Sequence, residues 1–152
     1  MTEPRTQTLP RRLPEVRIPV DRTFVVASAM ASQDFQDVHH DPDLARERGA
    51  PDIFLNILTS TGLVERLVTD WAGPAVTVNR LQIRLGMPCH PGDELVLTGE
   101  VSDEDSDQVV VQVRGTHERG VHVSGSVTVA LPEGTTLATL NDGRPAIEER
   151  SR

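Results

Sequence analysis

The fold class follows from residues 55–72, LNILTSTGLVERLVTDWA, and from the strand-like sequence after them. Apolar side chains recur in this segment at three- and four-residue steps, which is the spacing of one helix face. They include Leu55, Leu58, Leu63, Leu67, Val68 and Trp71. Ile57 and Val64 widen the apolar stripe, so we expect this helix to be buried on most sides. Gly73 and Pro74 end it.

From Ala75 onward, alternation of apolar and polar residues predicts strands alone. The first runs from Val76 to Met87 and changes phase near Asn79, which predicts a bulge. Three more strands are expected around residues 95–101, 109–113 and 121–131. One buried helix followed by four strands with short connections predicts an α+β fold, a strongly bent antiparallel sheet wrapped around the helix.

A length of 152 residues suits a single domain. We expect a flexible N-terminal arm over residues 1–14, the domain over residues 15–140, and a polar tail over residues 141–152.

The part of the domain before the long helix is more irregular. Residues 15–28 suit an extended lead-in and a first strand, with Phe24 to Val26 as its apolar part. A short helix is expected from Ala29 to Phe35, and a turn-rich stretch from Gln36 to Asp52.

Composition excludes several classes of function. The net charge of −8 argues against a nucleic-acid or anionic-membrane surface, because both need clustered Lys and Arg. The single cysteine, Cys89, cannot form an intrachain disulfide or a thiolate metal site. No apolar run approaches a membrane span, and the N-terminus lacks the apolar core of a secretory signal. We therefore expect a cytoplasmic protein.

The candidates for acid–base chemistry gather in residues 34–43, DFQDVHHDPD. A carboxylate and an imidazole are well suited to moving protons at neutral pH. If Asp34 closes a short helix and His39 follows a tight loop, both side chains can face one cleft. The long helix begins just downstream, and free N–H groups near Asp52 to Asn56 could bind a developing oxyanion.

Two other interpretations of the same stretch are open. Asp, His, Gln and Pro are ordinary residues of a solvent-exposed turn. A metal site would use His39, His40, Asp41 and Asp43. Adjacent ligands rarely close around one ion, and no distant Cys or His pair supports such a site, so we expect no metal.

Three local motifs resemble the MaoC-like family of (R)-specific enoyl-CoA hydratases. Asp34 and His39 keep the spacing of the family motif Asp-x-Asn-Pro-x-His, and residues 40–45, HDPDLA, match its continuation. Residues 91–95, PGDEL, resemble the family's turn between core strands. The resemblance runs from about Phe24 to Leu131 and implies a single hotdog domain.

A closer resemblance is carried by residues 34–41, 52–54, 56–59 and 68–74. These segments are similar to the small MaoC-like subunit of actinobacterial steroid side-chain enoyl-CoA hydratases, which works with a second MaoC-like subunit. Gln36 and Asp37 replace the general motif's Asn and Pro. Residues 54–56, FLN, stand where the family has a small glycine at the start of the central helix. The closer subfamily shares these departures.

The resemblance implies hydration of a 2-enoyl-CoA, with a steroid (cholesterol) side chain as the acyl group. Asp34 and His39 would be catalytic, and coenzyme A would enter as part of the substrate, with no separate cofactor. The residues expected to bind substrate are Gln36, Asp52, Ile53, Phe54 and Asn56. The expected partner is a second MaoC-like subunit in a heterodimer or heterotetramer, with a homodimer as the alternative.

Two further functions fit the same fold. A hotdog thioesterase would place its carboxylate on or near the long helix, where Asp52 and Glu65 are the candidates. A non-catalytic structural subunit of a heteromeric hydratase would be expected to have lost either Asp34 or His39. Arg80 and Arg84 could reach coenzyme A phosphates, although charged residues on an outward strand face are usually only solvated.

Overall fold

The computed structural model describes residues 7–106 and 108–138. The helices are α1 (Arg22–Ala31), the short 3-10 helix η1 (Asp37–His39), α2 (Pro42–Glu47) and α3 (Ile57–Ala72). The strands are β1 (Gln7–Leu9), β2 (Val16–Pro19), β3 (Thr77–Leu85), β4 (Glu94–Glu104), β5 (Val109–His117), β6 (Gly120–Ala130) and β7 (Thr135–Leu137). The tail expected at residues 141–152 lies outside the described residues.

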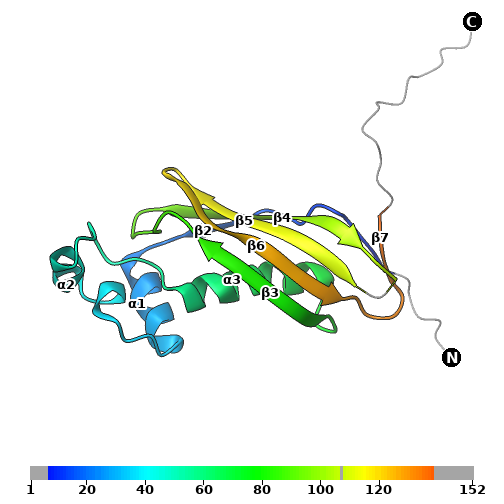
Figure 1. Cartoon of the computed structure of the whole chain (residues 1–152), viewed down its shortest axis with the longest axis horizontal. Helices are drawn as coiled ribbons and strands as arrows, with labels where there is room; N and C mark the ends of the chain where they lie inside the picture. Colours follow the sequence, from blue (N-terminus) through cyan, green and yellow to red (C-terminus); the bar gives the residue numbers. More distant parts are fainter. Residues whose placement is uncertain (1–6, 107, 139–152) are drawn as a thin grey trace, which may run out of the picture.

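One antiparallel sheet covers the long helix α3, as the sequence predicts. Its strand order is β2-β4-β5-β6-β3, so β3 forms one edge. The sheet curves along α3, and α1, η1 and α2 gather at the end of the molecule where α3 begins (Figure 1). The predicted bulge is confirmed, because the pairing of β3 with β6 shifts register between Val78 and Arg80.

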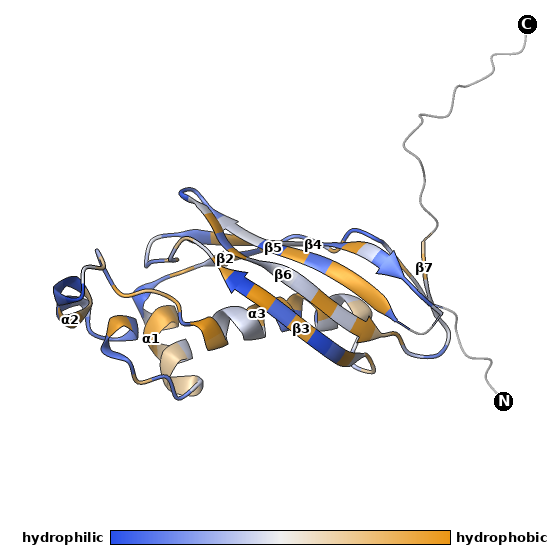
Figure 2. Cartoon of the chain, in the orientation of Figure 1, coloured by the Kyte–Doolittle hydropathy of each residue, from blue (hydrophilic) through white to orange (hydrophobic). Residues whose placement is uncertain are grey.

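The core lies between α3 and the inward face of the sheet. Val64, Leu67 and Val68 of α3 are buried, while alternate residues of β5 such as Val111 and Val113 meet them from the sheet. Apolar and polar residues alternate along β3 in Figure 2, as expected for a strand with only one covered face. The expected α+β architecture is therefore confirmed.

The expected first strand at Phe24 to Val26 is wrong, because these residues belong to α1. Asp21 caps this helix by accepting a hydrogen bond from the Phe24 N–H at 2.7 Å. Val25 and Ala29, one helical turn apart, are both buried. The helix expected from Ala29 to Phe35 therefore begins at Arg22 and ends at Ala31 instead. Its apolar residues repeat at the spacing of one helical turn and pack inward. A short apolar run does not distinguish strand from helix without this packing.

Residues 7–13 belong to the segment expected to be a flexible arm, but the structure packs them onto the domain. Strand β1 pairs with β7 in a parallel two-stranded sheet. Leu9 and Leu13 are buried, and the Trp71 indole N–H donates to the Pro10 carbonyl at 3.0 Å. The ordered domain thus begins earlier than residue 15. Among the described residues, no helix is long and apolar enough to cross a membrane.

Candidate active site

The structure brings Asp34 and His39 together. Asp34 follows α1, where its N–H donates to the Ala29 carbonyl at 2.9 Å, and His39 is the last residue of η1. Asp34 Oδ2 lies 3.5 Å from His39 Nε2, and the two side chains are 18% and 7% exposed. A carboxylate and an imidazole thus face each other while remaining reachable from one side. This is the arrangement that the five-residue spacing predicts.

The backbone fixes which nitrogen of His39 faces Asp34. His39 Nδ1 lies 2.7 Å from the Phe54 carbonyl oxygen, which can only accept, so Nδ1 carries the proton. The Phe54 ring meets the imidazole edge-on, with centroids 5.0 Å apart. In the neutral imidazole, Nε2 therefore presents a lone pair toward the Asp34 carboxylate. Two proton acceptors then face each other across a short gap.

Asn56 ties this pair to α3. It is the N-cap of α3, and its Oδ1 accepts from the Thr59 N–H at 2.9 Å. Because Oδ1 is used there, the amide nitrogen faces the other way and donates to Ser32 Oγ at 2.8 Å and Asp34 Oδ2 at 3.0 Å. The sequence marks Asn56 as substrate-binding, but in the structure its side chain holds Asp34. Ser32 was not anticipated, because a serine at a helix end carries no specific signal.

Two of the other expected substrate-binding residues make contacts away from the pair, and a third adjoins it only through its backbone. Asp52 pairs with Arg22 at 2.6 Å, and the Ile53 side chain is buried in the core. The Ile53 carbonyl accepts from His90 Nδ1 at 2.9 Å. Gln36 is exposed, and its backbone N–H lies 3.4 Å from Asp34 Oδ1. Of these three, only Gln36 adjoins the Asp34 carboxylate, and it does so through its backbone.

The free amides that could bind an oxyanion lie slightly later than expected. The Phe54 N–H donates to Val38 O at 3.2 Å and the Leu55 N–H to Cys89 O at 3.0 Å, so both are used within the protein. Within the described chain, no acceptor is found for the N–H groups of Ile57 and Leu58. They open the first turn of α3, where unpaired N–H groups and the helix dipole favour negative charge.

The side chains of the alternative metal site diverge. His40 Nε2 lies 3.1 Å from the Phe35 carbonyl, and Asp41 caps α2 by accepting from two backbone N–H groups. Asp43 pairs with Arg46 at 2.8 Å. Among the residues that the structure describes, no group of three or more His, Cys, Asp and Glu side chains is placed to hold a metal ion.

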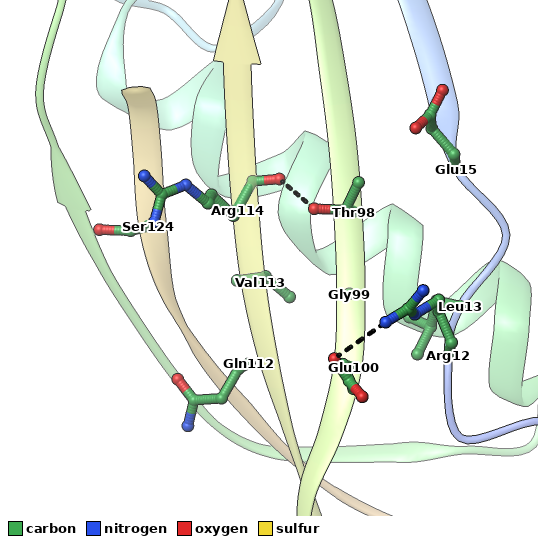
Figure 3. A pocket seen from close by; sticks show the side chains of 10 residues that line it. All are labelled: Arg12, Leu13, Glu15, Thr98, Gly99, Glu100, Gln112, Val113, Arg114 and Ser124. Atoms are coloured by element: carbon green, nitrogen blue, oxygen red, sulfur yellow. Dashed lines mark hydrogen bonds and ion pairs between the residues drawn. The ribbon is translucent and has the colours of Figure 1, made fainter. Parts of the chain in front are cut away.

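A surface cavity lies away from this site. It measures about 630 Å³ and sits on the sheet face opposite α3, between the N-terminal segment, β4 and β5 (Figure 3). Polar side chains line much of it, including Arg12, which approaches Glu100 to 3.8 Å. Thr98 hydrogen-bonds the Arg114 carbonyl across the neighbouring strands. The Asp34–His39 pair lies elsewhere, at the N-terminal end of α3.

His122 of β6 faces the core of the domain. It is 1% exposed, and Nε2 lies 2.8 Å from the hydroxyl of Ser60 on α3. The cause is a bulge, because Val121 pairs with Thr116 and Val123 with Gly115, which leaves His122 without a partner in β5. The alternation of β6 breaks at this point and His122 turns inward. Burial lowers the pKa of its imidazole.

Comparison with known proteins agrees with this architecture. The family described as MaoC like domain matches residues 6–121. The chain is 45% identical over 119 residues to the 3-oxo-4,17-pregnadiene-20-carboxyl-CoA hydratase beta subunit of Mycobacterium tuberculosis, covering 78% of this chain and 92% of that protein.

Solved structures give the same result. The crystal structure of the ChsH1–ChsH2 complex from Mycobacterium tuberculosis matches with a TM-score of 0.79 at 45% identity, over 80% of this chain and 95% of that one. The (R)-hydratase from A. caviae involved in PHA biosynthesis shares the fold at 21% identity, with a TM-score of 0.73 over 84% and 98% of the two chains. The fold is the hotdog fold, and the chain belongs to the MaoC-like family.

Proposed function

We propose that the chain is the catalytic subunit of a 2-enoyl-CoA hydratase. The observation that carries this proposal is the Asp34–His39 pair, held 3.5 Å apart at the N-terminal end of α3. The 45% identity to a subunit named as a steroid carboxyl-CoA hydratase supports a steroid side-chain enoyl-CoA as the substrate. Coenzyme A then belongs to the substrate, and the reaction needs no separate cofactor.

The pair is suited to holding and activating water. Asp34 Oδ2 and His39 Nε2 both accept hydrogen bonds, so one water molecule can donate an O–H to each. As the water oxygen forms a bond to the β-carbon of the enoyl group, the pair takes one proton and returns one to the α-carbon. The proton taken from water and the proton given to the α-carbon balance, so the pair ends the reaction as it began.

The start of α3 can stabilise the charge that this attack creates. When oxygen adds to the β-carbon, the alkene electrons move toward the thioester carbonyl, which becomes enolate-like. The unpaired N–H groups of Ile57 and Leu58 are placed to donate to that oxygen. Both side chains are 51% exposed, so an acyl thioester would meet an apolar surface on its way to these amides.

A second MaoC-like subunit is the partner that the surface favours. The inward row Leu81, Ile83 and Leu85 lies on the edge strand β3 and remains partly exposed, whereas Leu95 and Leu97 of β4 are buried. An uncovered apolar edge favours pairing with another sheet. The structural relative is a complex of two subunits, which supports a heteromer for this chain.

The two alternative functions receive less support. Of the two thioesterase candidates, Glu65 on α3 is exposed, and Asp52 near the helix start is paired with Arg22. A structural subunit would not need Asp34 and His39 facing each other, with His39 buried and Asp34 half-buried. We therefore favour the hydratase.

The test is hydration by the chain co-expressed with a MaoC-like subunit from the same genome. Loss of enoyl-thioester absorbance would be followed with a steroid side-chain enoyl-CoA and a short-chain enoyl-CoA. Asp34→Asn keeps the shape but removes the base, so activity should fall by at least about 100-fold. Asp43→Asn, in the neighbouring helix α2 with a side chain 90% exposed, should leave it unchanged. Equal rates for Asp34→Asn and wild type would place the chemistry in the partner.

A further inference from the structure

A buried histidine–serine pair lies beneath the site and takes no part in the proposed chemistry. His122 sits at the bulge of β6 and Ser60 in the first turn of α3, and each is 1% exposed. His122 Nε2 and Ser60 Oγ are 2.8 Å apart, although 62 residues separate them in the chain. Two polar groups buried in this way are costly unless both are fully hydrogen-bonded.

The protons of this pair can be assigned from its partners. His122 Nδ1 lies 2.9 Å from the Met87 carbonyl, which only accepts, so Nδ1 carries the proton. A neutral imidazole then accepts at Nε2, and the Ser60 hydroxyl is the donor. The Asn56 carbonyl, 3.1 Å from the same hydroxyl, still receives the Ser60 backbone N–H. Every polar atom of the pair is thereby satisfied in one arrangement.

The pair leads directly to the catalytic carboxylate. The Ser60 backbone holds the Asn56 carbonyl, which fixes the first turn of α3. The side chain of Asn56 caps that turn and donates to Asp34 Oδ2 at 3.0 Å. If the first turn shifted relative to the sheet, the amide of Asn56 would move away from Asp34. The bulge in β6 directs His122 to the one helix turn on which this contact depends.

We infer that His122 and Ser60 are positioning residues for the active site. His122 anchors the first turn of α3 to the sheet through Ser60, and Asn56 transmits that anchor to Asp34. The role in catalysis rests on the proposed hydratase function, whereas the anchoring of Asn56 does not. Neither residue touches the reacting atoms.

Two substitutions of His122 separate positioning from general stability. In His122→Gln the amide reaches the place of Nε2 and can still accept from Ser60, whereas the contact with Met87 is lost. In His122→Asn the shorter amide reaches the place of Nδ1 and keeps Met87, whereas Ser60 loses its partner. Each variant loses one buried hydrogen bond, so their melting temperatures should fall by similar amounts.

The kinetic result should differ between the two variants. With the full chain bound to its partner subunit, His122→Asn and Ser60→Ala should lower kcat by about 10- to 100-fold with little change in KM, because Asp34 loses its position. His122→Gln should keep kcat close to that of the wild type. If His122→Asn and His122→Gln lose kcat equally, in step with their melting temperatures, the role is structural and the inference is wrong.

A second measurement does not depend on activity. Hydrogen exchange of the Asn56 side-chain amide, followed by NMR, should be faster in His122→Asn and Ser60→Ala than in His122→Gln or the wild type. Equal exchange in all four proteins would overturn the inference. If the wild type fails to hydrate either substrate, the proposed function fails, and the exchange rates still decide whether His122 anchors Asn56.

Discussion

Single hydrogen bonds at Asp34 set the chemistry that its carboxylate can perform. Asn56 donates to Oδ2 and the Gln36 backbone N–H approaches Oδ1, while His39 offers an acceptor in its neutral form. Donors directed at a carboxylate favour its charged form, which is the form that can take a proton from water. The environment of Asp34 therefore suits a general base, and Asn56 is the strongest of its fixed donors.

Replacing Asn56 with Asp should test this at the level of one atom. Asn56→Asp keeps an oxygen for the Thr59 N–H, so the cap remains, but it places a second carboxylate beside Asp34. The lost donor and the added negative charge should lower kcat by about 10-fold or more with little change in KM, measured by hydration with the full chain bound to its partner. Asn56→Ser is the control, because it keeps a cap and adds no charge. A kcat in Asn56→Asp equal to that of the wild type would contradict the donor role.

Cys89 should be inert despite being the only thiol in the sequence. It is fully buried, and burial together with the nearby charge of Asp93 raises its pKa to about 12. The thiolate is the reactive form, so a thiol reagent at pH 8 should label the native protein only as fast as it unfolds. Rapid labelling in native buffer would show that the site is open.

The same pKa fixes the sign of a stability effect. The folded-state value lies above the ordinary 9.0, so the contribution of the thiol to folding is complete below about pH 9 and is lost as pH rises toward 12. The free energy of unfolding should therefore decrease with pH across that window. Cys89→Ala should lack this part of the decrease.

At the scale of elements, two glycines should respond in opposite ways to the same substitution. Gly62 lies inside α3, is exposed, and has nothing within 4 Å of where a Cβ would be. Gly62→Ala should raise the free energy of unfolding by about 0.5–1 kcal/mol, because alanine loses less backbone entropy in a helix. Thermal or urea unfolding of the purified chain measures the change.

Gly125 in β6 is the counterpart. A Cβ there would lie 2.0 Å from the Gln82 carbonyl oxygen on β3, and neither backbone can move without breaking the strand pair. Gly125→Ala should therefore destabilise the sheet, with a lower urea midpoint than the wild type. If the two variants changed stability in the same direction, the close approach of β3 and β6 would be in error.

At the scale of the whole molecule, the edge of the sheet formed by β3 is the expected contact with a partner. Leu85 ends β3 with a side chain 37% exposed on the same face as the core. If β3 meets a second MaoC-like subunit, Leu85→Asp should weaken that complex by roughly 10- to 100-fold, because a leucine is buried at the interface in the wild type. Titration of the labelled partner measures the affinity.

The control for this prediction is Thr98→Asp. Thr98 lies on the outward face of β4, away from the edge formed by β3, and is exposed. The same charge placed there should leave the affinity unchanged. Equal affinities for Leu85→Asp, Thr98→Asp and the wild type would mean that the partner binds elsewhere.

The sequence predicts those features of the molecule that depend on local periodicity. Residues 55–72 gave the central helix, and alternation after Ala75 gave the strands and the bulge near Asn79. The same reasoning failed for α1, because a short run of apolar residues suits either a helix or a strand until its packing is known. Asp34 and His39 were found because a short motif holds both, and a five-residue separation limits how far apart they can lie.

The supports of that pair depend on contacts between distant parts of the chain. Asn56 meets Asp34 across 22 residues and Ser60 meets His122 across 62, and neither contact leaves a periodic signal in the sequence. His122 even breaks the alternation of its strand, because a bulge turns it inward. Burial then determines the hydrogen bonds, since a polar group removed from water must find a partner wherever the fold brings one. The identity of the acid–base pair is therefore local in origin, whereas its orientation comes from the packing of α3 against the sheet.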